Sequence, residues 1–444
     1  MQIKILYMTK LKKWALSLSL LIMGGMTPTK ADVLTLDGCL EKAHDNYPVI
    51  KQYALVEKSR DLNVSNAAKA WLPGISVNGF AVGYTDILDF SSLNESIGKM
   101  TGSSIGMDNY IAGGALMINQ VVYDGGAISA KKNIAKAQSE VEQKKLDVSM
   151  YDVNSRVEQL YFGTLMLDEQ IRQNELLQSD LGISEKSVQS LVSGGMANQS
   201  DLDAVSVRLV QAQQQEINLK SMRKTYLSML GYFIGSPDLG TSVVLEKPAP
   251  LAVQGNSDSS LLTLRSSLNN RPELSLYSSQ QQLLDVQKKA LNARLMPTVG
   301  AFALGTAHTR PLGMINSTAV AGGLTVKWNI GALYTRKNDL AGLENQRSQI
   351  ETQRETFLFN NNMQTRQTDG QIENILKQMQ LDDKAVTLRQ GIRDKAEKKV
   401  KNGTETVNEL LRDINAVSEA KQQKAIHEIQ LLQAEYNLKL IKNN

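Results

Sequence analysis

The chain has 444 residues, a formal net charge of +4, one cysteine, three histidines and nine prolines. A single cysteine excludes an internal disulfide framework and any metal site built from several thiolates. The three histidines, His44, His308 and His427, are too far apart in sequence to form a short metal-binding motif. The sequence also has no Gly-x-Ser-x-Gly motif and no phosphate-binding loop, so we expect neither an enzyme nor a cofactor.

The basic excess lies at the start of the chain. Residues 1–31 hold five lysines and no acid, so their removal changes the net charge from +4 to −1. Lysines precede the apolar run 14–23, and small residues follow it up to Ala31. This pattern predicts a secretory signal peptide, because about ten apolar residues are too few to span a bilayer as a helix. A nucleic-acid partner therefore loses its main support.

Cys39 lies in the amphipathic segment 36–43, where we expect it to be a buried small hydrophobic residue. Lipidation is the alternative, since Gly38 precedes it. Asp37 is a poor neighbour for that processing, and Cys39 lies outside the apolar run.

Proline spacing divides the mature chain into two similar halves. The tracts 74–236 and 312–444 contain no proline and are rich in helix-forming residues, which predicts long helices. We interpret 32–240 as a first structural repeat, 241–260 as a linker and 261–444 as a second repeat. Four pairs of motifs recur in the same order, with one drop of 19 residues in their offset. The pairs are Asn46-Tyr-Pro48 with Asn270-Arg-Pro272, Trp71-Leu-Pro73 with Leu295-Met-Pro297, Asp124-Gly-Gly126 with Asn329-Ile-Gly331, and Gly195 with Gly403.

Each half is expected to contain a helix, two strands and a long helical hairpin. The alternation of apolar and polar residues predicts strands at 74–84, 115–123, 298–306 and 320–328. Helices are predicted at 127–192 and 333–400, each about 100 Å long, with turns at Gly195 and Gly403 and returning helices to about 234 and 441. No globular core requires rods of this length.

The strands favour a membrane protein built from several copies of the chain. Period-two alternation over about ten residues is typical of a transmembrane β-strand, although a strand of a soluble sheet is the alternative. Four strands per chain leave open edges that hydrocarbon does not tolerate. Two copies would give eight strands and three would give twelve, and this reasoning does not choose between them.

The duplicated motifs resemble those of the TolC family of outer-membrane efflux proteins. The residues that carry the resemblance are Leu34-Thr-Leu36, Asn46-Tyr-Pro48, Tyr123-Asp-Gly-Gly126, Asn270-Arg-Pro272-Glu-Leu, Trp328 and the turns at Gly195 and Gly403. The resemblance implies a mixed α/β membrane protein of the outer membrane that extends into the periplasm. Trimerisation would complete its transmembrane β-barrel, with four strands per chain, above a periplasmic α-barrel of long helical hairpins.

The resemblance also implies partners and a function. A homotrimer would serve as the exit duct of a tripartite efflux or type I secretion system, together with a periplasmic adaptor and an inner-membrane pump. It would passively export small molecules or proteins. A periplasmic adaptor or a secreted coiled-coil structural protein is the alternative, and the sequence does not identify the cargo.

By position, the resemblance places a periplasmic gate near the two turns. Asp201 and Glu409 match acidic gate residues. Glu405 stands where some members have Arg, and Arg412 stands where they have a second acid, so we expect Arg412 to be able to pair with Glu409. The alternative for all four is a solvated helix face. The adaptor contacts implied at the hairpin tips are Gly194, Gly195, Asn402 and Gly403.

The first half contains an additional polar segment, 86–109, between its two strands. It is predicted to be a longer extracellular loop.

Overall fold

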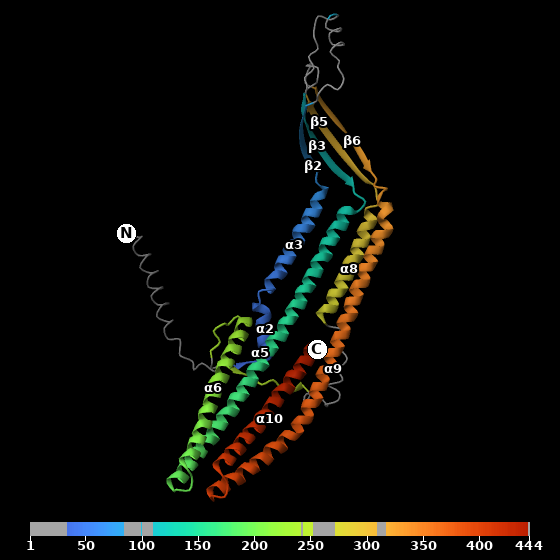
Figure 1. Ribbon diagram of the computed structural model, residues 1–444. Coiled ribbons are helices and arrows are strands. Elements are labelled where there is room, and N and C mark those ends of the chain that lie inside the picture. The colour runs from blue at the N-terminus through green and yellow to red at the C-terminus, as the bar shows by residue number, and fades with distance from the viewer. Residues whose placement is uncertain are drawn as a thin grey trace, which may run out of the picture. The chain divides into compact units, whose positions relative to one another are not determined.

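The computed structural model describes residues 33–83, 99, 110–240, 243–251, 271–308 and 317–442 (Figure 1). The predicted signal peptide and, apart from residue 99, the predicted loop at 86–109 lie outside this part of the chain, as does most of the predicted linker. Two compact units are formed. We call Met1–Tyr47, Val153–Leu262 and Thr368–Leu438 the hairpin unit, and Pro48–Asp152, Thr263–Gln367 and Lys439–Asn444 the sheet unit.

The sheet unit contains a four-stranded antiparallel sheet and the helices that lead into and out of it. Its strands are β2 (Gly74–Gly83), β3 (Tyr110–Tyr123), β5 (Thr298–His308) and β6 (Ser317–Lys327), in the order β2-β3-β5-β6. Helix α3 (Ile50–Ala68), with the 3-10 turn Lys69–Trp71, precedes β2, and α8 (Pro272–Ala293) precedes β5. The long helices α5 (Ala127–Ser193) and α9 (Ala332–Lys401) follow β3 and β6.

The register of the sheet places apolar residues from all four strands on one face. Ile75 pairs with Ile118 and Val77 with Leu116, while Leu116 pairs with Gly305, and Gly305 with Val320. Directly paired residues point to the same side of a sheet. Val77, Leu324 and Val326 on this face are 78, 76 and 72% exposed in the single chain. The opposite face is mixed, with polar and apolar residues: Ser76, Asn78, Asn119 and Thr325 alternate with Phe80, Met117, Phe302 and Leu304.

Two of the duplicated motifs have a local structural explanation in the sheet unit. Asp124 caps α5, since its carboxylate accepts from the backbone N–H groups of Gly126 (2.9 Å) and Ile128 (2.5 Å). Gly125 has a φ of 66°, and a Cβ there would overlap with Cβ of Met296. The Asp-Gly-Gly motif therefore makes the tight strand-to-helix turn.

The Asn-Arg-Pro-Glu motif secures the end of the chain. Arg271 precedes Pro272 at the start of α8, pairs with Glu273, and lies 4.5 Å from the ring centroid of Tyr151. Its Nη1 donates to the carbonyl oxygens of Leu440 and Ile441, at 3.2 and 3.4 Å. A cation at the last carbonyls of a helix complements their partial negative charge.

The hairpin unit is a layer of helices that follow one another as α6, α5, α10 and α9 (Figure 1). Helix α6 (Gln199–Phe233) returns along α5, and α10 (Val407–Lys442) returns along α9. Its main core includes Val157, Tyr161 and Phe162 of α5, Leu230 of α6 and Leu432 of α10. Polar pairs add to these contacts, such as that between Arg223 of α6 and Asp168 of α5.

A short parallel sheet, which the sequence did not predict, joins the start of the chain to the connection between the halves. Strand β1 (Val33–Leu34) pairs with β4 (Val244–Leu245). The Tyr161 hydroxyl lies 2.8 Å from the Leu34 carbonyl oxygen and 2.6 Å from that of Glu246, so it spans both strands.

Cys39 lies in α2 (Leu36–Asn46), which Thr35 caps by accepting from the backbone N–H of Gly38. The side chain is fully buried in the main core, as expected. Burial raises the pKa of its thiol to about 11.

No helix in the described part of the chain is both long and apolar enough to cross a membrane.

Candidate functional site

The two hairpin turns, which carry the predicted gate residues, lie side by side at one end of the hairpin unit (Figure 1). They share one hydrophobic cluster, to which all four long helices contribute. Its most buried members are Leu181 and Val188 of α5, Val205 of α6, Ala396 of α9 and Ile414 of α10. The structure therefore brings together residues that are about 200 positions apart in sequence.

The two turns have the same backbone geometry. In the first turn, Gly195 has a φ of 71°, and the N–H of Met196 donates to the carbonyl of Leu191 at 2.8 Å. In the second turn, Gly403 has a φ of 70°, and the N–H of Thr404 donates to the carbonyl of Lys399 at 2.9 Å. This is the Schellman arrangement, in which a left-handed glycine closes the end of a helix.

Gly194 and Asn402, the other two predicted adaptor contacts, belong to the same helix ends. Each N–H is within hydrogen-bonding distance of a carbonyl of the last helical turn, that of Ser190 for Gly194 and those of Lys398 and Lys399 for Asn402. All four predicted contact residues are therefore parts of the turns themselves.

Both predicted gate acids lie at the third position of a returning helix and close its first turn. The carboxylate of Asp201 accepts from the N–H of Asn198 at 3.1 Å. The carboxylate of Glu409 accepts from both the N–H and the hydroxyl of Thr406, each at 3.0 Å. The Thr406 hydroxyl in turn accepts from the N–H of Glu409 at 3.3 Å, which completes a capping box.

The bonds from Thr406, first from its N–H and then from its hydroxyl, lower the pKa of the Glu409 carboxyl. The positive charge of Arg412 adds to this effect. Thus Thr406, rather than Arg412, makes the hydrogen bonds that hold Glu409. Arg412 is exposed, which leaves its charge at the surface near the turn.

Glu405 is only 17% exposed, and its Oε2 lies 3.4 Å from Nζ of Lys399. The pair joins the end of α9 to the second turn. The first turn has neutral residues in this region: the sequence Gly194-Gly-Met-Ala-Asn198 has no charge, and Met196 is 66% exposed.

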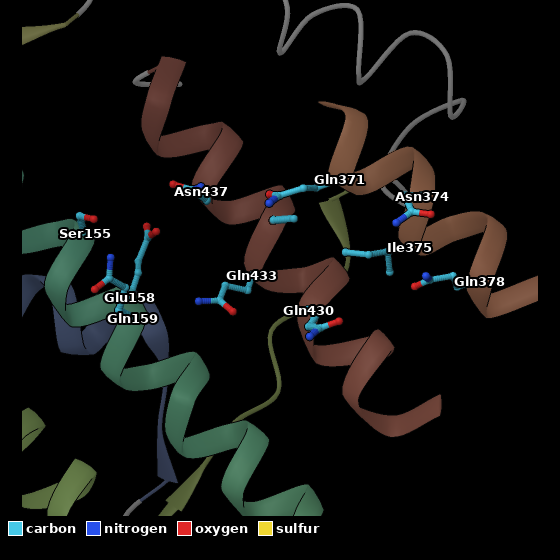
Figure 2. A pocket seen from close by; sticks show the side chains of 11 residues that line it. Ser155, Glu158, Gln159, Gln371, Asn374, Ile375, Gln378, Gln430, Gln433 and Asn437 are labelled. Carbon is cyan, nitrogen blue, oxygen red and sulfur yellow. The ribbon is translucent and has the colours of Figure 1, made fainter. Parts of the chain in front are cut away.

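A polar groove of about 460 Å³ lies elsewhere in the hairpin unit, between α5, α9 and α10 (Figure 2). Most of its lining side chains are neutral amides or hydroxyls, and Glu158 is the acid among them. The sequence analysis missed this groove, although amides recur at helical spacing on α9 and α10. The lining residues are Ser155, Glu158, Gln159, Gln371, Asn374, Ile375, Gln378, Gln430, Gln433, Ala434 and Asn437.

The sequence analysis also missed a buried polar contact between α9 and α10. Nδ1 of His427 lies 2.8 Å from Oδ2 of Asp382, and its Nε2 lies 2.8 Å from Nε2 of Gln423. Among the residues that the structure describes, no group of three or more His, Cys, Asp or Glu side chains is arranged to hold a metal ion.

The sequence profile described as "Outer membrane efflux protein" matches residues 39–236. No curated protein matches the chain in sequence.

Solved structures with the same fold are found at low sequence identity. The outer-membrane channel OprN is similar over 92% of this chain and 90% of its own, with 13% identity and a TM-score of 0.67. The outer membrane protein VceC from Vibrio cholerae is similar over 92 and 94%, with 12% identity and a TM-score of 0.64. The CmeC outer membrane channel of Campylobacter jejuni is similar over 92 and 84%, with 14% identity and a TM-score of 0.61.

Proposed function

We propose that the chain belongs to the outer membrane efflux protein family, whose profile matches residues 39–236, and that three copies of it form the exit duct of a tripartite efflux or type I secretion system. It is an outer-membrane efflux channel that extends into the periplasm, and the family consists of channels, which are not enzymes. In this proposal an inner-membrane pump, coupled through a periplasmic adaptor, drives small molecules or proteins through the duct.

The open edges of the sheet support assembly from several copies. Strands β2 and β6 are the outermost of the four, and each pairs with a single neighbour in the sheet. Unpaired backbone N–H and C=O groups are too costly in hydrocarbon, so another copy must cover these edges. Three copies would supply twelve strands, enough to close a barrel with a passage inside.

The outer helices of the hairpin unit support the same assembly. Helices α6 and α9 lie at opposite ends of the layer, and each exposes apolar side chains. On α6, Val207 and Ile217 are 54 and 71% exposed, and on α9, Leu381 and Leu388 are 66 and 58% exposed. Burial of these side chains between copies would contribute roughly 25 cal/mol for each Å² removed from water.

The observation that carries the gate proposal is the common position of Asp201 and Glu409 in two adjacent turns. In a trimer, each acid would occur three times around the axis at the end of the duct. Glu405 and Arg412 would modify the field of this ring, and Gly194, Gly195, Asn402 and Gly403 would present the turns to the adaptor. Charged rings of this kind set the ion preference of a narrow pore.

Conductance in planar bilayers tests the proposal. The purified protein should form channels that conduct, and Glu409→Gln should lower their cation selectivity because it removes a negative charge from the ring. Arg412→Ala should raise that selectivity. Glu419→Gln is the matched control, because Glu419 is an exposed acid further along the same helix.

Two failures would have different meanings. Channels that keep the same selectivity and resting conductance in both variants would contradict the gate. Wild-type protein that remains monomeric after detergent extraction and does not conduct would contradict the trimeric duct.

A further inference from the structure

Basic residues are concentrated where the helices of the sheet unit meet the sheet. Eleven residues adjoin each strand at this end, in the segments 63–73, 124–134, 287–297 and 328–338. These segments contain a single acid, Asp124. Their basic residues, which we call the basic collar, are Lys69, Lys131, Lys132, Lys288, Lys289, Arg294, Arg336 and Lys337.

The excess of basic residues is confined to these segments and is absent from the residues next to them, further from the sheet. The next eleven residues of each segment, 52–62, 135–145, 276–286 and 339–349, contain six basic and seven acidic residues. The net charge thus changes from +7 to −1 within roughly 16 Å of helix. General surface solubility does not require this boundary, because both zones belong to the same helices.

The charges of the collar are available to a partner. The acid within it, Asp124, is buried and caps α5. Lys131, Lys288, Lys289 and Lys337 are all exposed. Their flexible stems allow each ammonium group to reach several ångströms along the surface towards the sheet.

Aromatic side chains surround the same level of the molecule. Trp71 and Tyr123 are 40 and 48% exposed, and Trp328 and Tyr334 are 60 and 85% exposed. Trp328 lies two residues after Val326 and extends the apolar face of the sheet. Exposed Trp and Tyr at the end of an apolar band are typical of the boundary between membrane and water.

The collar also contains a hollow of about 400 Å³ between the ends of α8 and α9. Arg294 and Arg336 line it, and Nη2 of Arg336 donates to Oδ1 of Asn292 at 3.1 Å, which fixes the guanidinium there. Asp339 also lines the hollow and accepts from the hydroxyl of Thr335. Arginine suits phosphate because its planar fork can donate two parallel hydrogen bonds.

We propose that the basic collar binds the headgroups of anionic phospholipids in the periplasmic leaflet of the outer membrane. The apolar face of the sheet fixes the level of the hydrocarbon, the aromatic residues mark its boundary, and the lysines and arginines lie where headgroup phosphates are located. The proposal rests on the outer-membrane location and not on the cargo, the pump or the gate. Lipid binding at this level would fix the depth of the sheet in the membrane.

The chain contains its own probe for the test. Of its three tryptophans, Trp14 lies in the predicted signal peptide, and Trp71 and Trp328 adjoin the collar. The protein that lacks only the predicted signal peptide is reconstituted into bilayers of phosphatidylcholine and phosphatidylglycerol in equal parts. Two preparations are compared, one with brominated acyl chains on phosphatidylcholine and one with brominated acyl chains on phosphatidylglycerol. Bromine quenches nearby tryptophan, so the ratio of the two quenching efficiencies measures local enrichment.

We expect stronger quenching by the brominated phosphatidylglycerol, and loss of this preference in the variant K131Q/K288Q/K289Q/K337Q. Each lysine near an anionic surface changes the binding constant by roughly fivefold at low salt, so the four together should reduce the preference at least tenfold. High salt should weaken it as well. The matched control, K224Q/K384Q/K395Q/K398Q, removes the same charge from exposed positions in the hairpin unit and should retain the preference.

Equal quenching by the two lipids in the wild type, or an equal loss in both variants, would overturn the proposal. Conductance of the same bilayers is recorded separately. A channel that conducts without a lipid preference would contradict the collar alone. A protein that shows the preference without conducting would contradict the duct alone.

Discussion

The two hairpin turns have the same backbone conformation but different side chains around it. Gly195 and Gly403 have nearly the same φ, and each is followed by the same hydrogen bond back into the preceding helix. In the second turn, the Thr406 side chain closes a capping box and Lys399 pairs with Glu405. In the first turn, Asn198 and Asp201 form the corresponding capping box, and the N–H of Asp201 also donates to the backbone carbonyl of Asn198. Residues 194–198 of this turn are uncharged.

Features that both turns share are those that the backbone geometry requires, and features of one turn alone affect only its surface. The glycine and the acid at the third helical position occur in both turns, so the fold accounts for them. The Lys399–Glu405 ion pair and the cap residue Thr406 occur in the second turn only, so the backbone geometry does not require them. They are therefore the features most suited to distinguish the two tips when a partner binds.

The largest expected effect comes from the glycines. Gly195→Ala and Gly403→Ala should each destabilise the turn by about 1–2 kcal/mol, because an L-residue is strained in the left-handed region. A Cβ would meet no atom within 4 Å at either position, so this cost is purely conformational. Hydrogen exchange at the turn amides measures the opening free energy.

Gly391→Ala provides the opposite sign as a control. Gly391 lies within α9, where a Cβ also meets nothing within 4 Å, so alanine should stabilise the helix by up to about 1 kcal/mol. If Gly391→Ala destabilised the protein as much as Gly403→Ala, the loss of stability at Gly403 would come from crowding in the assembled protein and not from backbone strain.

The cap residues of α10 and α6, Thr406 and Asn198, should contribute different amounts to the stability of their helix starts. Thr406→Ala removes the hydroxyl that contacts both Glu409 and its N–H, and should cost about 1 kcal/mol. Asn198→Ala should cost less, because the N–H of Asp201 already has the backbone carbonyl of Asn198 as its acceptor. Exchange at residues 199–202 and 407–410 compares the two helix starts directly. Equal costs would mean that the Asn198 side chain caps α6 as strongly as Thr406 caps α10.

The smallest expected effect is a dependence on pH at the second turn. Because the pKa of Glu409 is lowered from its ordinary value of 4.5, its stabilising effect is fully present above that value. The effect should be lost as the pH falls below 4.5 and through the lowered pKa. Exchange at residues 407–410, corrected for the intrinsic rate, should show this loss in the wild type. Glu409→Gln should remove the dependence, and a variant that retains it would exclude Glu409 as its source.

Long-period patterns made most of the fold predictable. The absence of proline predicted that α5 and α9 would be long, and the motifs before each helix and the glycine turns after it placed their ends to within one residue. Strand β3 begins at Tyr110, five residues before the expected start at 115. Its first residues pair with β2. The apolar-polar alternation within one strand does not show how far that strand pairs with a neighbour, so the start of β3 could not be predicted from it.

The contacts of the site were less predictable than its position. Sequence spacing located Asp201 and Glu409 near the turns, but it did not show that both carboxylates close the helices they begin. We expected Glu409 to pair with Arg412 because the two residues have opposite charges and lie three positions apart on one helix. The hydrogen-bond partner of Glu409 is instead Thr406, the residue just before the helix, whose backbone and side chain both reach the carboxylate. The groove around Gln433 and the parallel strands β1 and β4 depend on segments far apart in sequence, so no local pattern reveals them.

The small sheet of β1 and β4 imposes an order of events on folding. Strand β1 is made first, but its partner β4 follows about 210 residues later. At roughly 5–20 residues per second, β1 therefore waits on the order of 10–40 s during synthesis for the strand that completes it. The Tyr161 hydroxyl can contact both carbonyls only after that time. The segment that contains β1 is thus fixed only once the whole first half exists. The core around Tyr161 is completed later still, because Ile429 and Leu432 of α10 belong to it.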